Sequence, residues 1–291
     1  MPEIAPHLWF DTQAVEAATF YTSLLPKSEV VAVRTLRDTP SGDCDVVAFT
    51  MAGQPFQAIS AGPLFQLNPS ISFVINCETP GEVDELWSKL SDGSTTLMPL
   101  DGYPFSERFG WLNDRYGLSW QIMHTASVTQ KIVPSFLFVG DVCGRTEEAV
   151  DFWTSVFENT KVDHVMKRGP GQEPEKEGSV LHAGFTLEGY EFAAMDSALD
   201  HQFAFNEAVS LVVLCDSQDE IDRYWNALSA VPESEQCGWL KDRFGVSWQI
   251  VPRAMEKMMQ DADEPTLARI TQAFLPMKKL EIATIEKAYA G

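Results

Sequence analysis

The sequence predicts an α+β protein of two tandem domains, each with paired βαβββ modules, followed by C-terminal helices. A fourteen-residue segment, Gly110–Met123, returns as Gly238–Val251, with ten identical positions at an offset of 128 residues. Strand-like and helix-like runs recur in the same order around both copies. Internal repetition of this kind determines the architecture of a chain, so it comes before any local assignment.

Each copy of the repeated segment predicts a β-hairpin. In the first copy Trp111-Leu112 ends one strand, Asp114–Gly117 supplies turn residues, and Leu118–Ile122 begins the next strand. Alternating apolar residues on both sides of an Asp- and Gly-containing turn are typical of hairpins.

In the first half of the chain, a strand over residues 4–10 precedes a helix over 12–25, for which Asp11 or Thr12 is the expected N-cap. Further strands are expected, with a tight turn at Gly53-Gln54, over residues 29–37, 45–52, 55–61 and 70–77. A second helix over 80–91 leads to the first hairpin. The first 125 residues therefore contain two βαβββ modules.

The same order returns over residues 131–252, so we predict domains at 1–126 and 131–252 and a helical extension at 253–291. The first copy has an additional segment, Thr95 to Phe105, expected to form a strand and a loop over a pocket mouth. The second copy instead has a polar loop, Arg168 to Gly178, expected to be solvated and flexible.

The extension is helical by period over 253–261 and 265–290, with Pro276 as a break or kink. Leu267, Ile270 and Phe274 form one apolar stripe. Such a stripe predicts packing across the two domains or onto a partner subunit.

Composition excludes several classes of function. The net charge of −21 repels phosphate backbones and anionic lipid, so neither nucleic acid nor a membrane surface is an expected partner. The N-terminal residues lack a secretory pattern. Five scattered cysteines form no C-x-x-C pair. These features predict a cytoplasmic location with reduced thiols.

The phrases His7–Asp11, Phe20–Leu24, Gly53–Phe56 and Ile71–Cys77, together with both hairpins, carry a family resemblance. The chain resembles the vicinal oxygen chelate superfamily of glyoxalase I, bleomycin-resistance proteins and extradiol dioxygenases. The closer similarity is to the PhnB-like, "3-demethylubiquinone-9 3-methyltransferase-like" branch. This superfamily places many activities on one scaffold, so the resemblance implies the fold more firmly than the reaction.

The resemblance implies tandem glyoxalase-like domains, in each of which the paired modules form a curved open barrel around one cavity. It also implies metal ligands on the first and last strands of each module. The matching positions are, in the first half, His7, Gln57, Ser70 and Gln121, and in the second half Ser135, Ala193, Ala208 and Gln249. The sequence departs from the glyoxalase pattern because both carboxylates are missing and Ser70 stands where a second histidine is expected. His7 and Gln121 are the candidate ligands of a divalent metal, although one imidazole and neutral amides compensate little of its charge.

Two functions follow from this asymmetry between the halves. The first is a pocket in domain 1 with metal-assisted lyase, isomerase or dioxygenase chemistry on a vicinal-oxygen substrate, with domain 2 mainly structural; the second is non-catalytic binding of the bleomycin-resistance type. The pocket candidates are His7, Trp9, Gln57, Ser70, Trp111 and Gln121. A third hypothesis is an assembly protein whose acidic surface and C-terminal helices bind another protein, and a homodimer is one such assembly. The methyltransferase name of the branch has no support from an S-adenosylmethionine motif, because no glycine-rich turn follows a first strand.

Overall fold

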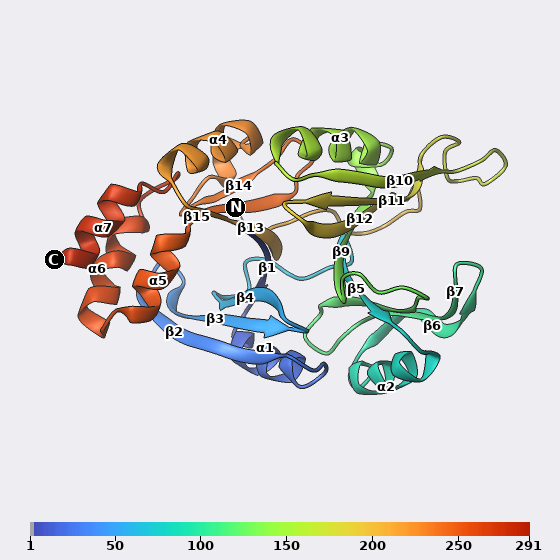
Figure 1. Ribbon diagram of the computed structural model, residues 1–291, viewed down its shortest axis with the longest axis horizontal. Helices are drawn as coiled ribbons and strands as arrows, with labels where there is room; N and C mark the ends of the chain where they lie inside the picture. Colours follow the sequence, from blue (N-terminus) through green and yellow to red (C-terminus); the bar gives the residue numbers. More distant parts are fainter. Residues whose placement is uncertain (1–2) are drawn as a thin grey trace. The chain divides into compact units, whose positions relative to one another are not determined.

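The computed structural model describes residues 3–291 and confirms the α+β class, with two separate open β-sheets (Figure 1). The chain forms two compact units. Unit 1 combines the residues up to Gln66 with Asn206–Gly291, and unit 2 comprises Leu67–Phe205. Within residues 3–291, no helix combines the length and the apolar character that crossing a bilayer requires.

Unit 1 contains a seven-stranded sheet in the order β14-β15-β13-β1-β4-β3-β2. Its strands are β1 (Glu3–Phe10), β2 (Glu29–Thr39), β3 (Gly42–Met51), β4 (Gln54–Ser60), β13 (Val209–Cys215), β14 (Trp239–Lys241) and β15 (Ser247–Pro252). The helix α1 (Ala14–Thr22) packs on β3 and β4, whereas α4 (Gln218–Leu228) packs on β13 and β15. A short 3₁₀ turn, Pro232–Ser234, precedes β14.

Helix α1 begins later than the sequence predicted. Neither Asp11 nor Thr12 caps it; the amide of Ala14 instead donates to Ser60 Oγ at 3.0 Å. The cap therefore comes from the end of β4, a contact that no local pattern reveals.

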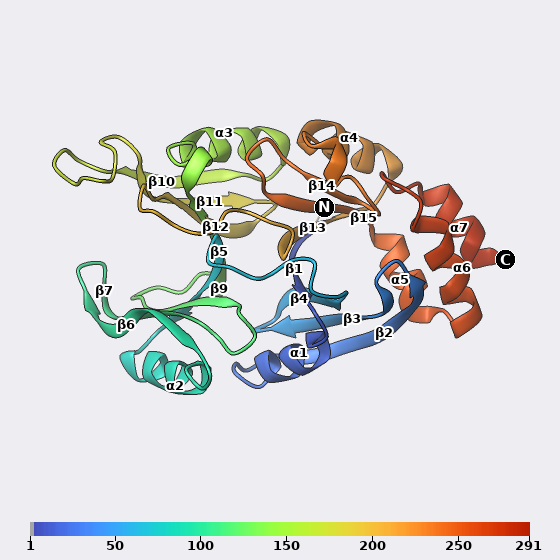
Figure 2. The ribbon, with the colours of Figure 1, turned by 180° about the vertical axis from the view of Figure 1, so that it is seen from behind.

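The C-terminal helices belong to unit 1. They are α5 (Arg253–Asp261), α6 (Glu264–Phe274) and α7 (Ile282–Ala290), grouped together in both views (Figures 1 and 2). The predicted stripe of Leu267, Ile270 and Phe274 is buried in one cluster with Leu36 of β2. Because β2 comes from the first repeat and α5 follows the second, these helices connect elements of both repeats within one unit.

Unit 2 contains an eight-stranded sheet in the order β10-β11-β12-β9-β5-β8-β7-β6. Its strands are β5 (Ile71–Cys77), β6 (Thr95–Tyr103), β7 (Ser106–Asn113), β8 (Ser119–His124), β9 (Ile132–Phe138), β10 (Lys161–Lys167), β11 (Val180–Leu187) and β12 (Tyr190–Asp196). Helix α2 (Pro80–Leu90) packs on β7 and β8, and α3 (Thr146–Val156) packs on β11; a 3₁₀ turn, Gly140–Val142, precedes α3. The predicted segment after Thr95 is thus mainly the edge strand β6.

The compact units do not coincide with the predicted domains 1–126 and 131–252. In unit 1, β1 of the first repeat pairs antiparallel with β13 of the second, and in unit 2, β5 pairs antiparallel with β9. Each unit therefore combines one module from each repeat, rather than both modules of one repeat. The first strand of every module has an edge that needs a partner, and these pairings satisfy it across the repeats.

Both predicted hairpins form, and an aspartate holds each of them. Asp114 Oδ1 accepts from the amides of Tyr116 and Leu118, and Oδ2 accepts from Trp120 Nε1 at 2.9 Å. Asp242 repeats these bonds in the second hairpin, including one from Trp248 Nε1 at 3.0 Å. Both carboxylates are buried. The repeated segment is therefore a structural motif that fixes a turn to the strand following it.

Candidate functional site

A pocket with a volume of about 720 Å³ lies entirely in unit 1. Alternate residues of β1 line it, because successive side chains of a strand point to opposite faces. The lining from the sheet includes Glu3, Ala5, His7 and Trp9 of β1, Val46, Ala48 and Thr50 of β3, and Pro55, Gln57 and Ile59 of β4. Met255, Glu256 and Met259 of α5 also line it. Most of this wall is apolar, as in small-molecule sites.

His7 contributes an imidazole to the pocket wall and is buried, with 4% of its surface exposed. It stands in register with Gln57 of β4 and Ser210 of β13. Its Nδ1 is buried and has no hydrogen-bond partner among the described residues. Burial lowers the pKa of His7 to about 3, so the ring is neutral at physiological pH. An unpaired polar atom in a pocket wall is costly unless a ligand or water satisfies it.

A carboxylate faces the same pocket from α5. Gln57 Nε2 donates to Glu256 Oε1, which fixes the orientation of both side chains. Burial raises the pKa of Glu256, and the neighbouring Glu3 adds to the rise. Arg253 on the same helix is engaged elsewhere, because it bonds to Glu3 and to Asp216, each at 2.8 Å.

Aromatic rings form another part of the wall. Trp9 lies edge-on to Phe65 at 5.0 Å and to Trp239 at 6.1 Å between ring centroids. The rings of Trp239 and His7 are perpendicular, with 5.3 Å between their centroids. The indole nitrogen of Trp9 donates to Gly62 O at 2.7 Å, so the ring is held in place. These rings can receive a flat or apolar ligand.

The structure brings together only part of the predicted site. His7, Trp9 and Gln57 line the pocket of unit 1, whereas Ser70, Trp111 and Gln121 belong to unit 2. There Gln121 Nε2 donates to Ser72 Oγ at 2.8 Å, and Trp111 Nε1 donates to Ser119 Oγ at 2.8 Å. The predicted grouping of His7 with Gln121 assumed that the two modules of one repeat form one sheet. In the structure β1 pairs instead with β13 of the other repeat, so His7 and Gln121 belong to different units.

Among the polar and aromatic residues that line the pocket, Trp239 and Glu256 were not among the predicted candidates, and Gln249 was named only as the second-half equivalent of Gln121. Trp239 and Gln249 are the repeat equivalents of Trp111 and Gln121, so the repeat itself contained the signal. Gln249 Nε2 donates to Ser210 Oγ at 2.9 Å, as Gln121 does to Ser72. Glu256 lies outside the repeats and had no comparable signal.

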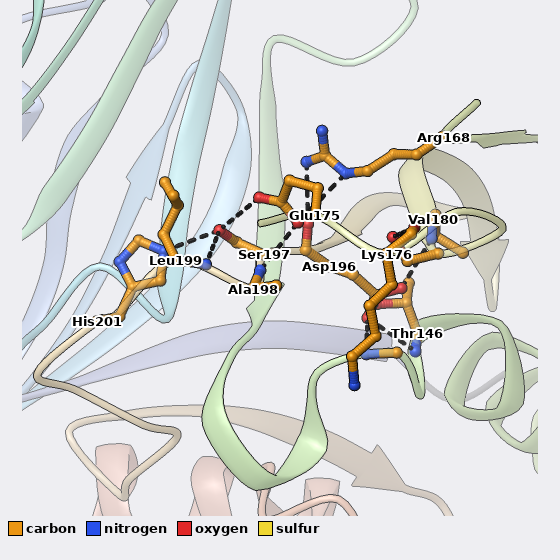
Figure 3. A network of polar contacts seen from close by, with 12 residues as sticks. Thr146, Arg168, Glu175, Lys176, Val180, Asp196, Ser197, Ala198, Leu199 and His201 are labelled. Atoms are coloured by element: carbon orange, nitrogen blue, oxygen red, sulfur yellow. Dashed lines mark hydrogen bonds and ion pairs between the residues drawn. The ribbon is translucent and has the colours of Figure 1, made fainter. Parts of the chain in front are cut away.

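A second polar network lies in unit 2, where the loop after β10 folds back on the chain (Figure 3). Glu175 lies between Arg168 and Ser197, accepting from Ser197 Oγ at 3.1 Å and from the amide of Ala198 at 2.9 Å. The side chains of Arg168 and Glu175 are only 17% and 11% exposed, so the prediction of a solvated loop is wrong for both. His201 Nε2 is 2.9 Å from Ser197 Oγ. Because the Ser197 hydroxyl and the Ala198 amide both donate to the Glu175 carboxylate, this network anchors the loop.

The pocket residues do not fit a resident metal. In the described part of the chain no three His, Cys, Asp or Glu side chains stand close enough to hold an ion. The amides of Gln57 and Gln249 could offer only their oxygen atoms, which are neutral ligands and compensate none of the charge of a divalent ion. A cofactor whose phosphates bind a glycine-rich loop and the free amides of a helix N-terminus does not fit either. The residues between β1 and α1, Asp11–Gln13, include no glycine, and the amide of Ala14 already donates to Ser60 Oγ. The pocket residues therefore suit neither a resident metal nor such a cofactor.

The fold and the repeated modules define a glyoxalase-like protein of the vicinal oxygen chelate superfamily, with two tandem repeats. The model of the family described as 3-demethylubiquinone-9 3-methyltransferase matches residues 2–123 and again 130–251, and the chain belongs to this family. Both matches correspond to the sequence repeats and end before α5.

The chain is also similar to solved structures. A putative 3-demethylubiquinone-9 3-methyltransferase, PhnB protein, from Bacillus cereus is 38% identical over 42% of this chain and 98% of its own, with a TM-score of 0.39. Glyoxalase I from Zea mays is 9% identical over 90% of this chain and 98% of its own, with a TM-score of 0.58. A putative dioxygenase from Bacillus subtilis is 12% identical over 97% and 94%, with a TM-score of 0.50. The last two show the fold alone. No curated protein is significantly similar to the chain.

Proposed function

We propose that unit 1 binds and sequesters a small organic molecule with an apolar body, and that unit 2 has a mainly structural role. The observation that supports this most is the buried, unpartnered Nδ1 of His7 in the wall of a pocket large enough for such a molecule. A ligand group bonded to Nδ1 would satisfy that atom, while the indoles of Trp9 and Trp239 contact the apolar body.

Metal-assisted chemistry on a vicinal-oxygen substrate is the less supported alternative. Beside His7 the pocket offers neutral amides and the carboxylate of Glu256, and among the described residues no three His, Cys, Asp or Glu side chains gather to hold a divalent ion. Burial also lowers the pKa of His7 to about 3, which makes the imidazole a weak general base near neutral pH. Metal analysis of protein purified without chelator separates the two readings. A stoichiometric metal in the wild type that is lost in His7→Ala would overturn the binding-only function.

The pocket itself is tested by filling it. Ala48 lines the pocket in register with Gln57, so Ala48→Phe places a ring in the space meant for the ligand. We expect one molecule of the neutral apolar dye Nile red to bind per chain, with affinity at least tenfold weaker in Ala48→Phe. Val33→Phe is the matched control, because Val33 is 42% exposed on β2 and does not line the pocket. Equal dye binding by wild type and Ala48→Phe would contradict the proposal.

A further inference from the structure

Helix α5 supplies the pocket with the carboxylate of Glu256. This side chain is half-buried and is oriented by the amide of Gln57. Glu256 Oε1 accepts from Gln57 Nε2, and no described residue is found bonded to Oε2. Because α5 follows the second repeat, this carboxylate lies outside the part of the chain that the family model matches. It is therefore a feature that this chain adds to the common scaffold.

No ion pair of Glu256 is found among residues 3–291. Arg253 on the same helix is shared between Glu3 and Asp216, and Arg34 of the pocket lining donates to the backbone oxygen of Gln260. When ionised, the four groups Glu3, Asp216, Arg253 and Glu256 carry two net negative charges. The neighbouring Glu207 of the lining is already paired with Lys241 at 2.9 Å. A cation brought in by a ligand would stabilise the ionised form of Glu256 and oppose the rise of its pKa that burial causes.

The aromatic part of the wall suits the remainder of such a ligand. Trp9, Trp239 and Phe65 present ring edges and faces, and aromatic faces also attract cations. The net charge of −21 over the whole chain favours the approach of positively charged molecules and disfavours anions.

We propose that Glu256 determines specificity by pairing with the ammonium group of an amine ligand whose aromatic body lies against Trp9 and Trp239. This inference rests on the proposed binding function of unit 1 and adds the chemical class of the ligand. Gln57 positions the carboxylate by donating to Oε1, which leaves Oε2 to accept from the ammonium group.

The test uses three probes that share one indole ring: tryptamine as the cation, tryptophol as the neutral analogue and indole-3-acetate as the anion. Dissociation constants for the full chain are measured by calorimetry, supported by saturation-transfer NMR. We expect tryptamine to bind about tenfold more tightly than either analogue, since a desolvated charge pair is worth at least that factor. Glu256→Gln should weaken tryptamine about tenfold and leave tryptophol unchanged.

Glu286→Gln is the matched control, because Glu286 is exposed on α7 and does not line the pocket, yet the same charge is removed. Equal affinity for tryptamine and tryptophol, no binding of tryptamine, or an equal loss in Glu286→Gln would each overturn the inference. The proposed function would survive these outcomes if Nile red still bound and Ala48→Phe still blocked it, so the two failures are distinguishable.

Discussion

Four equivalent strand positions in the two units hold the same residue types at two places and different ones at the other two. The shared positions belong to the fold, and the different ones belong to the pocket. In unit 1 these positions hold His7, Gln57, Ser210 and Gln249; in unit 2 they hold Ser135, Ala193, Ser72 and Gln121. The glutamine-to-serine hydrogen bond is present in both units, so it belongs to the architecture. The histidine and the second glutamine occur only where the pocket of unit 1 lies.

The packing around the two positions that differ is also different in the two units. In unit 2, Ala193 is buried together with Val74 and Val133, and Ser135 is 2% exposed beside it. In unit 1, His7 and Gln57 instead border a cavity that α5 completes. Unit 2 thus shows what the scaffold needs, and unit 1 shows what has been added to it.

The largest expected effect concerns the shared architecture. Asp242→Ala leaves two backbone amides and the indole of Trp248 without their buried acceptor, and we expect a loss of about 3–4 kcal/mol of unfolding free energy. Asp114→Ala should cost a similar amount in unit 2. Urea unfolding followed by tryptophan fluorescence measures both, with Asp242→Asn as the control that retains one acceptor oxygen. A loss below about 1 kcal/mol in either variant would show that the hairpins are not held by their aspartates.

Exchanging residues between the units tests the part that differs. Ser135→His forces an imidazole into a closely packed face and should cost about 2–3 kcal/mol of unfolding free energy. His7→Ser should change stability by less than about 1 kcal/mol, because it shortens a side chain that borders a cavity and removes an unpaired buried nitrogen. Equal losses in the two variants, measured by the same denaturation, would mean that unit 2 has room for a ligand at this position too.

These contrasts also explain how far the sequence could lead. The hairpins, the module order and the helical extension follow from local pattern, because turn residues and apolar periods act over a few positions. The pairing of β1 with β13 could not be predicted, since four equivalent first strands compete for the same edge. Trp239 and Gln249 were recoverable from the repeat, but only with that pairing known. Glu256 enters the pocket through the packing of α5, which depends on tertiary contacts alone.

The smallest effect is a pH dependence that differs between the units. Burial lowers the pKa of His7 to about 3, whereas an unfolded histidine titrates near 6.5. Between these values the unfolded chain binds a proton that the folded chain does not, so falling pH favours unfolding. Relative to His7→Ser, the wild type should lose about 2 kcal/mol of unfolding free energy between pH 8 and pH 5.

His182 in unit 2 provides the comparison. Burial, with the adjacent His164 adding to the effect, lowers the pKa of His182 to about 4, so the sign is the same. His182 is only half-buried, however, and its ring is 2.8 Å from His164 at the surface of the sheet, where water screens the charge. The difference between wild type and His182→Ser should therefore vary less with pH than that for His7→Ser. A flat difference for His7→Ser would mean that Nδ1 takes up a proton inside the pocket, and the imidazole would then be a cationic rather than a neutral part of the ligand site.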